Sequence, residues 1–165
     1  MSGLVTPTKR ILRPLLNVVL VDPCIPQNTG AISRLCAATK VHMIIAGTPK
    51  FKISDANLKR AGLDYWEHLS WELQPDKEAF FKSLDPGRVH ILTSKTDTPY
   101  THMKPITGDY LFFGSEVTGV PAHWRETHPD RCFTLPMFSD HVRCLNLANT
   151  VAVSVYDGLR QLEAF

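Results

Sequence analysis

Short apolar runs alternate with segments of helical periodicity along this chain. Runs rich in Val, Ile, Leu and Phe that end at Gly or Pro predict strands, and apolar residues recurring every three or four positions predict helices. Strands that alternate with helices are typical of an α/β domain, a mostly parallel sheet covered by helices on both faces. The predicted strands span residues 17–22, 41–46, 89–93, 110–113 and 132–135, and the predicted helices span 27–40, 54–61, 76–84 and 145–162.

The pattern is richest where the strand at 110–113 ends. Gly114 follows the strand, then the lone acidic residue Glu116, then Gly119 and Pro121. This order indicates a strand, a tight turn and a helix start, and α/β proteins bind ligands at the carboxyl ends of such strands. The spacing leaves two interpretations of Glu116 about equal: a carboxylate that caps the next helix, or a residue of a ligand site.

Two further strand ends, at residues 92–95 and 135–137, would lie beside the turn at 114–116 if the three strands were neighbours. Their backbone groups would then suit an adenine ring and a ribose. The glycine-rich fingerprint of dinucleotide-binding folds does not follow the first predicted strand, and no P-loop motif occurs. The pattern therefore argues against a P-loop NTPase.

Composition narrows the class of protein. The 165 residues, 44% of them apolar and 21% charged, suit one globular domain with its own core. No apolar run reaches the length of a membrane span, and the four cysteines form no CxxC pair. We therefore expect a cytoplasmic protein with no membrane or metal partner. Residues 1–16 are predicted to form a basic, disorder-prone extension before a single domain over 17–165.

Several polar residues have both a structural and a chemical interpretation. Arg34 would be a surface arginine of its helix or a guanidinium that binds a phosphate or orients a hydroxyl. Asn28 and Asn146 stand near predicted helix starts and would be caps or site amides. Lys59, Arg60 and Tyr65 mix basic and aromatic character, which suits RNA phosphates and unstacked bases but also an ordinary solvated face.

Four motifs, in order, resemble the trefoil-knotted SPOUT RNA methyltransferases. They are Ile25-Pro26-Gln27-Asn28-Thr29-Gly30 with the segment 34–37, then the segments 58–65, 108–121 and 145–156. The resemblance runs from about residue 17 to residue 162 and is greatest with a small single-domain subgroup. It departs at Ser115, where the family usually has proline, and at Val142-Arg143-Cys144, where it usually has Ser-Arg-Ser in a loop one residue shorter.

The resemblance implies a deep trefoil knot in the C-terminal part, a homodimer, and S-adenosyl-L-methionine bound in the knot. It also implies 2′-O-methylation of the wobble cytidine or uridine of leucine tRNAs. Three alternatives remain open: a non-catalytic knotted RNA-binding protein, a methyltransferase of another tRNA or rRNA site, and an unrelated nucleotide-binding α/β domain.

The resemblance also assigns roles to residues. Arg34 would face the ribose 2′-hydroxyl, with Asn28, Glu116 and Asn146 shaping the catalytic site. The cofactor would contact Leu92, Thr93, Gly114, Glu116, Leu135, Met137, Cys144 and Leu145, and the RNA would contact Lys59, Arg60, Tyr65 and Arg143.

Overall fold

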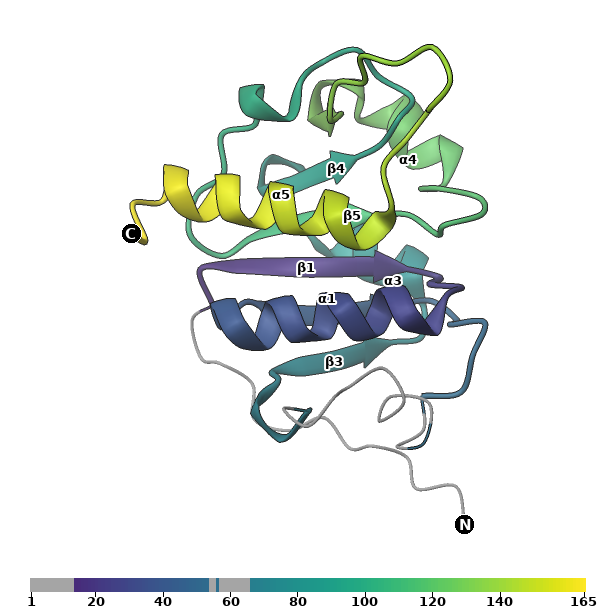
Figure 1. The fold of residues 1–165 in the computed structure, drawn as a ribbon, viewed down its shortest axis with the longest axis vertical. Helices are drawn as coiled ribbons and strands as arrows, with labels where there is room; N and C mark the ends of the chain where they lie inside the picture. Colours follow the sequence, from purple (N-terminus) through teal and green to yellow (C-terminus); the bar gives the residue numbers. More distant parts are fainter. Residues whose placement is uncertain (1–13, 54–55, 57–65) are drawn as a thin grey trace.

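The computed structural model describes residues 14–53, 56 and 66–165, and its centre is a parallel sheet (Figure 1). Within these residues the sheet has six strands in the order β3-β2-β1-β5-β4-β6, and every neighbouring pair is parallel. The strands are β1 (Leu16–Val21), β2 (His42–Ala46), β3 (Trp71–Gln74), β4 (Val89–Leu92), β5 (Asp109–Phe113) and β6 (Cys132–Phe133).

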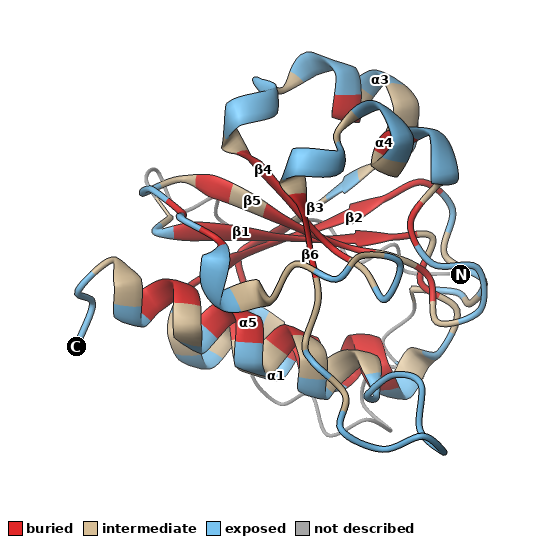
Figure 2. Cartoon of the chain, turned by 90° about the horizontal axis from the view of Figure 1, so that it is seen from above, coloured by how far each residue is buried: buried red, intermediate tan, exposed pale blue. Residues whose placement is uncertain are grey.

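Helices cover both faces of the sheet, as the alternating pattern predicts. The long helices α1 (Pro26–Thr39) and α5 (Leu147–Gln161) lie side by side on one face. The shorter α3 (Lys77–Ser83) and α4 (Ala122–Thr127) lie on the other face (Figure 2). Single 3-10 turns complete the described part: η1 (Trp66–His68), η2 (Pro86–Arg88), η3 (Tyr100–His102) and η4 (Pro129–Arg131).

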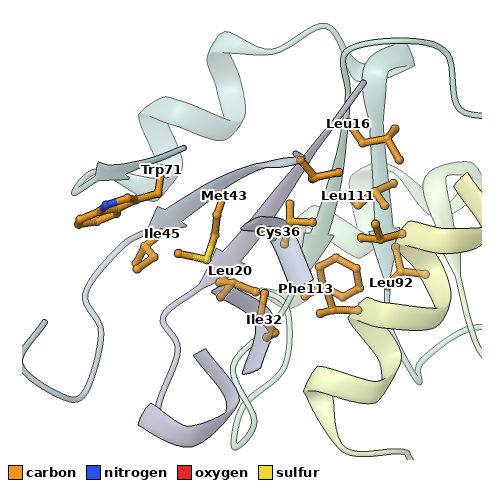
Figure 3. Close-up of a cluster of buried hydrophobic side chains, with 14 of the residues drawn as sticks. Leu16, Leu20, Ile32, Cys36, Met43, Ile45, Trp71, Leu92, Leu111 and Phe113 are labelled. Carbon is orange, nitrogen blue, oxygen red and sulfur yellow. The ribbon is translucent and has the colours of Figure 1, made fainter. Parts of the chain in front are cut away.

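Each face of the sheet has its own apolar core. Successive strand side chains point to opposite faces, so Leu16 and Leu20 of β1 join the core beneath α1 and α5 (Figure 3). Val19 joins the opposite core, where the rings of Phe81 and Trp124 stack with centroids 4.1 Å apart. The central strands are buried on both faces, which explains why they appear in the sequence as unbroken apolar runs.

The structure corrects two details of the predicted elements and leaves a third mostly undescribed. β3 was not predicted, because it is a short edge strand, Trp-Glu-Leu-Gln, in which apolar and polar residues alternate and no continuous apolar run forms. The predicted strand 132–135 pairs with β4 only through Cys132 and Phe133, since the backbone of Thr134 bonds to Thr98 and Tyr100 instead. The predicted helix 54–61 lies outside the described residues except at residue 56, and so do residues 1–13 of the predicted extension.

A buried polar cluster joins the amino ends of β4 and β5. The carboxylate of Asp109, 1% exposed, accepts hydrogen bonds from His90 Nε2 at 2.8 Å and from the backbone N–H of Ile106 at 2.9 Å, and it pairs with Arg88. Burial alone would raise the pKa of Asp109. The hydrogen bonds from His90, Ile106 and Arg88 outweigh burial and hold that pKa below its usual value.

We expect Asp109→Asn to lower the free energy of unfolding by about 3 kcal/mol at neutral pH, because His90 and Arg88 lose a buried acceptor. A carboxyl group with a lowered pKa stabilises the fold above its unfolded pKa of about 3.9, and this contribution is lost as the pH falls through the folded value. The deficit should therefore shrink in acid. Urea unfolding of the wild type and of Asp109→Asn, from neutral pH into acid, measures this difference in the free energy of unfolding.

Asp157→Asn is the matched control, since the ion-pair partner of Asp157 is the exposed Arg160. It should cost less than about 1 kcal/mol. Equal effects of the two substitutions, or a deficit for Asp109→Asn that does not depend on pH, would contradict the assignment.

Candidate functional site

A cavity of about 570 Å³ opens at the carboxyl ends of three neighbouring strands. Leu92, Phe113 and Phe133, the last residues of β4, β5 and β6, all line it. The three segments expected to meet, 92–95, 114–116 and 135–137, do meet here, because β5, β4 and β6 are adjacent in the sheet. The volume lies within the range of about 300–1,000 Å³ that is usual for small-molecule sites.

The turn after β5 folds back tightly on itself. A Cβ at Gly114 would lie 2.1 Å from the backbone of Gly119 and Val120, so only glycine fits there. Gly119 has φ +70° and donates its N–H to the carbonyl of Ser115 at 2.9 Å. Ser115 Oγ accepts from the backbone N–H of Val117 at 3.2 Å. The hydroxyl of Ser115 thus stabilises the turn.

Glu116 reaches from this turn to the start of α1. Its carboxylate accepts hydrogen bonds from the backbone N–H groups of Cys24 at 2.7 Å and Ile25 at 3.2 Å, and from Asn28 Nδ2 at 3.3 Å. Ile25 is the N-cap residue of α1 and provides no side-chain cap of its own. A helix N-terminus carries unsatisfied N–H groups and partial positive charge, both of which a carboxylate stabilises.

Glu116 therefore does bond to a helix start, as the capping interpretation says, but the helix is α1 and not the helix that follows it. The carboxylate does not cap α4, the helix that follows it, which has no side-chain cap. It bonds at the start of a helix more than 80 residues earlier in the chain, and it lines the cavity as well.

Asn28 continues the connection to α5. Its Oδ1 accepts from Asn146 Nδ2 at 3.0 Å, and Asn146 Oδ1 accepts from the backbone N–H groups of Ala148 and Asn149 as the N-cap of α5. Asn28 is 8% exposed, so these bonds are largely shielded from water. The line Glu116–Asn28–Asn146, here called the polar link, joins the turn after β5 to the first turns of α1 and α5.

Most of the predicted site residues meet at the cavity. The three residues of the polar link and Arg143 line it, and so do all the predicted cofactor contacts: Leu92, Thr93, Gly114, Glu116, Leu135, Met137, Cys144 and Leu145. Arg34 does not. It lies exposed on α1, outside the cavity lining. Lys59, Arg60 and Tyr65 fall outside the described residues.

Sequence patterns missed Arg125 of α4 and Thr150 of α5, which also line the cavity. They also missed the backbone N–H groups of Cys24 and Ile25 as donors to Glu116. No local signal marks these residues, because only the packing of α4 and α5 brings the first two to the strand ends.

Positive charge surrounds the cavity. Lys95, Arg125 and Arg143 line it, and within the described part of the chain none of the three forms an ion pair. Glu116, the one carboxylate among the described lining residues, already accepts from N–H donors. The described residues contain no group of three side chains suited to a metal ion, and none of the described helices has the length and hydropathy needed to cross a membrane.

Known proteins resemble this chain over most of its length. Residues 15–156 match the model of the SpoU rRNA Methylase family. The tRNA (cytidine(34)-2′-O)-methyltransferase of Burkholderia cenocepacia is 41% identical over 150 residues, which are 89% of this chain and 96% of that protein.

Solved structures give the same result. One, described as giving structural insights into the 2-OH methylation of C/U34 on tRNA, is 34% identical with a TM-score of 0.80, and the match covers 92% of this chain and 99% of the other. The SpoU methyltransferase AviRb from Streptomyces viridochromogenes, in complex with the cofactor AdoMet, is 21% identical with a TM-score of 0.76; the match covers 94% of this chain and 63% of AviRb. The predicted family is thus confirmed: the chain belongs to the SpoU methylase family and has the α/β fold of its knotted structural neighbours.

Proposed function

We propose that this chain is an S-adenosylmethionine-dependent tRNA 2′-O-methyltransferase that modifies the wobble nucleotide, cytidine or uridine 34, of leucine tRNAs in the cytoplasm. The observation that carries the proposal is the cavity at the ends of β4, β5 and β6, bordered by the polar link and by three cationic side chains. Support also comes from the 41% identity to an enzyme named for methylating cytidine 34 of tRNA.

The cavity suits S-adenosylmethionine in shape and chemistry. Leu92, Leu135 and Leu147 offer apolar surface to an adenine ring. The tight turn from Gly114 to Gly119 lines the cavity, so its backbone groups are available to polar groups of the cofactor. We assign the cofactor to Leu92, Thr93, Gly114, Glu116, Leu135, Met137, Cys144 and Leu145. When bound, S-adenosylmethionine supplies a methyl group made electrophilic by its positively charged sulfur.

The residues of the chain act mainly by positioning the ribose. A ribose hydroxyl is a poor nucleophile at neutral pH, so its proton must be accepted or the forming oxyanion stabilised. Among the described residues no histidine lines the cavity, and the Glu116 carboxylate is engaged by N–H donors at the start of α1. We assign Glu116, Asn28 and Asn146 to shaping the site, and the charge of Arg34 to orienting and stabilising the 2′-oxygen. Correct placement of the two substrates supplies much of the rate.

The position of Arg34 outside its own cavity is explained by a homodimer, which we include in the proposal. Exposed residues three or four apart share a helix face. Ala31, Arg34 and Ala38 form one such row on α1, while Val153 and Tyr156 belong to another on the adjacent α5. The exposed surface of these two rows, four uncharged side chains with Arg34 among them, is here called the α1/α5 stripe and suits a second copy of the chain. Arg34 would then act at the boundary between subunits.

The proposed activity predicts which atom receives the methyl group. Purified protein should transfer a labelled methyl group from S-adenosylmethionine to a leucine tRNA with cytidine or uridine at position 34. The same tRNA carrying a 2′-deoxynucleotide at that position alone should accept none, because the nucleophilic oxygen is missing. Equal labelling of both RNAs would refute the site of methylation, and no labelling of either would refute the activity.

We expect Arg34→Ala to reduce methyl transfer by about 100-fold or more, as for loss of a group that stabilises developing charge. The affinity for S-adenosylmethionine, measured by calorimetry, should not change, because Arg34 lies outside the cavity lining. Lys82→Ala, at an exposed cation of α3 on the opposite face, is the control and should retain full activity. Lost cofactor binding or full activity of Arg34→Ala would each contradict the role.

The homodimer predicts that Val153→Asp yields a folded monomer in sedimentation velocity, because it places a carboxylate in the apolar α5 row of the α1/α5 stripe. Val153 is 39% exposed in the single chain, so the fold should tolerate the substitution. Ile106→Asp provides the matched control. Ile106 is 56% exposed and lies before β5, at the opposite end of the sheet from the cavity. A monomeric wild type, or a Val153→Asp variant that stays dimeric, would contradict this interface.

A further inference from the structure

The connection from β6 to α5, residues 134–146, projects beside the cavity. It is exposed along most of its length and leads to the first turn of α5 (Figures 1 and 2). Thr134 anchors one end through backbone hydrogen bonds to Thr98 and Tyr100, at 2.8 and 2.7 Å, and Asn146 anchors the other as the N-cap of α5. Residues on both sides of the tip line the cavity, whereas the tip itself, residues 138–142, does not.

Phe138 stands on this tip with its ring in solvent. It is 98% exposed, the highest value among the exposed large hydrophobic residues of the described chain. Its ring makes no contact with another described aromatic ring, so both faces are accessible. Burying a Phe side chain contributes about 1.5–3 kcal/mol, so a partner that covered this ring would be bound more tightly.

The surrounding charge indicates what kind of partner that is. Met137, directly before Phe138, lines the cavity together with the cationic side chains of Lys95, Arg125 and Arg143. The tip also carries the imidazole ring of His141, and Asp140 is the only carboxylate of the tip. An exposed aromatic ring on the same connection as the cationic Arg143 matches a single-stranded nucleic acid, whose phosphates bind cations and whose bases stack on aromatic rings.

The proposed reaction creates a base in need of such a surface. For a ribose to enter a concave site, its nucleotide must leave the base stack, which exposes one face of the neighbouring base to water. We propose that Phe138 stacks on the base next to the methylated nucleotide while Arg143 binds the phosphate between the two. This inference rests on the proposed function and adds a residue that positions the RNA rather than the cofactor.

The test combines a change in the protein with a change in the RNA. The substrates are an anticodon stem-loop of a leucine tRNA and two versions with an abasic site, one at position 33 and one at position 35. With the intact RNA, Phe138→Ala should raise the KM for RNA about tenfold, within the effect of losing one base–aromatic stack. Phe138→Trp should restore the wild-type KM, and Ile106→Ala, at an exposed apolar residue far from the cavity, should leave it unchanged.

The decisive result is whether the effects of Phe138→Ala and of the abasic site on the KM for RNA are additive. With one of the two abasic RNAs, the wild type should show the same raised KM, and Phe138→Ala should add nothing further, since the stack is already lost. The dissociation constant for S-adenosylmethionine and the sedimentation coefficient should be unchanged throughout. Fully additive effects with both abasic RNAs would overturn the inference.

Other results would distinguish base stacking by Phe138 from alternative roles of the tip and from failure of the proposed function. Weaker cofactor binding by Phe138→Ala would identify the tip as a cover for the cofactor, and an altered oligomeric state would identify it as a protein contact; either result overturns the stacking role. An active wild type with an unaffected Phe138→Ala variant would overturn this inference alone. A wild type that neither binds nor methylates the stem-loop would overturn the proposed function along with it.

Discussion

The site depends on one carboxylate that bonds to a distant helix start. Glu116 accepts from two backbone N–H groups at the start of α1 and from Asn28, and Asn28 in turn bonds to Asn146 at the start of α5. This contact joins the turn after β5 to the first turn of α1, a helix that has no side-chain cap of its own. The polar link is therefore a constraint on the shape of the whole cavity.

The parallel sheet supplies the other side of that cavity. Because β5, β4 and β6 are adjacent and parallel, the residues that follow them emerge at the same edge, and their apolar side chains form the wall opposite α1 and α5. The result is a partly apolar space that is lined on one side by the polar link and also by the cationic side chains of Lys95, Arg125 and Arg143. That division suits a small cofactor with an aromatic ring inside and a polyanionic RNA outside, which is the basis of the proposed methyl transfer.

The sequence predicted features that a local pattern marks, and it did not predict features that depend on the packing of distant segments. The apolar runs of β1 and β5 were predicted to within a residue, since they are buried on both faces. β3 escaped notice because half of its residues are polar. The resemblance to known methyltransferases supplied the predicted cofactor contacts, all of which line the cavity, but fewer than half of its lining residues. The partner of Glu116 could not be predicted, because the groups it binds are about 90 residues away in the chain.

Calorimetric titration with S-adenosylmethionine tests the central claim most directly, that the polar link shapes the cofactor cavity. Glu116→Gln replaces an acceptor oxygen with an NH₂ group that faces N–H donors, so the account predicts at least about tenfold weaker binding than the wild type, equivalent to about 1.4 kcal/mol. Glu126→Gln makes the same change at an exposed position of α4 and should bind as the wild type does. Equal affinity of the wild type and Glu116→Gln would contradict the account.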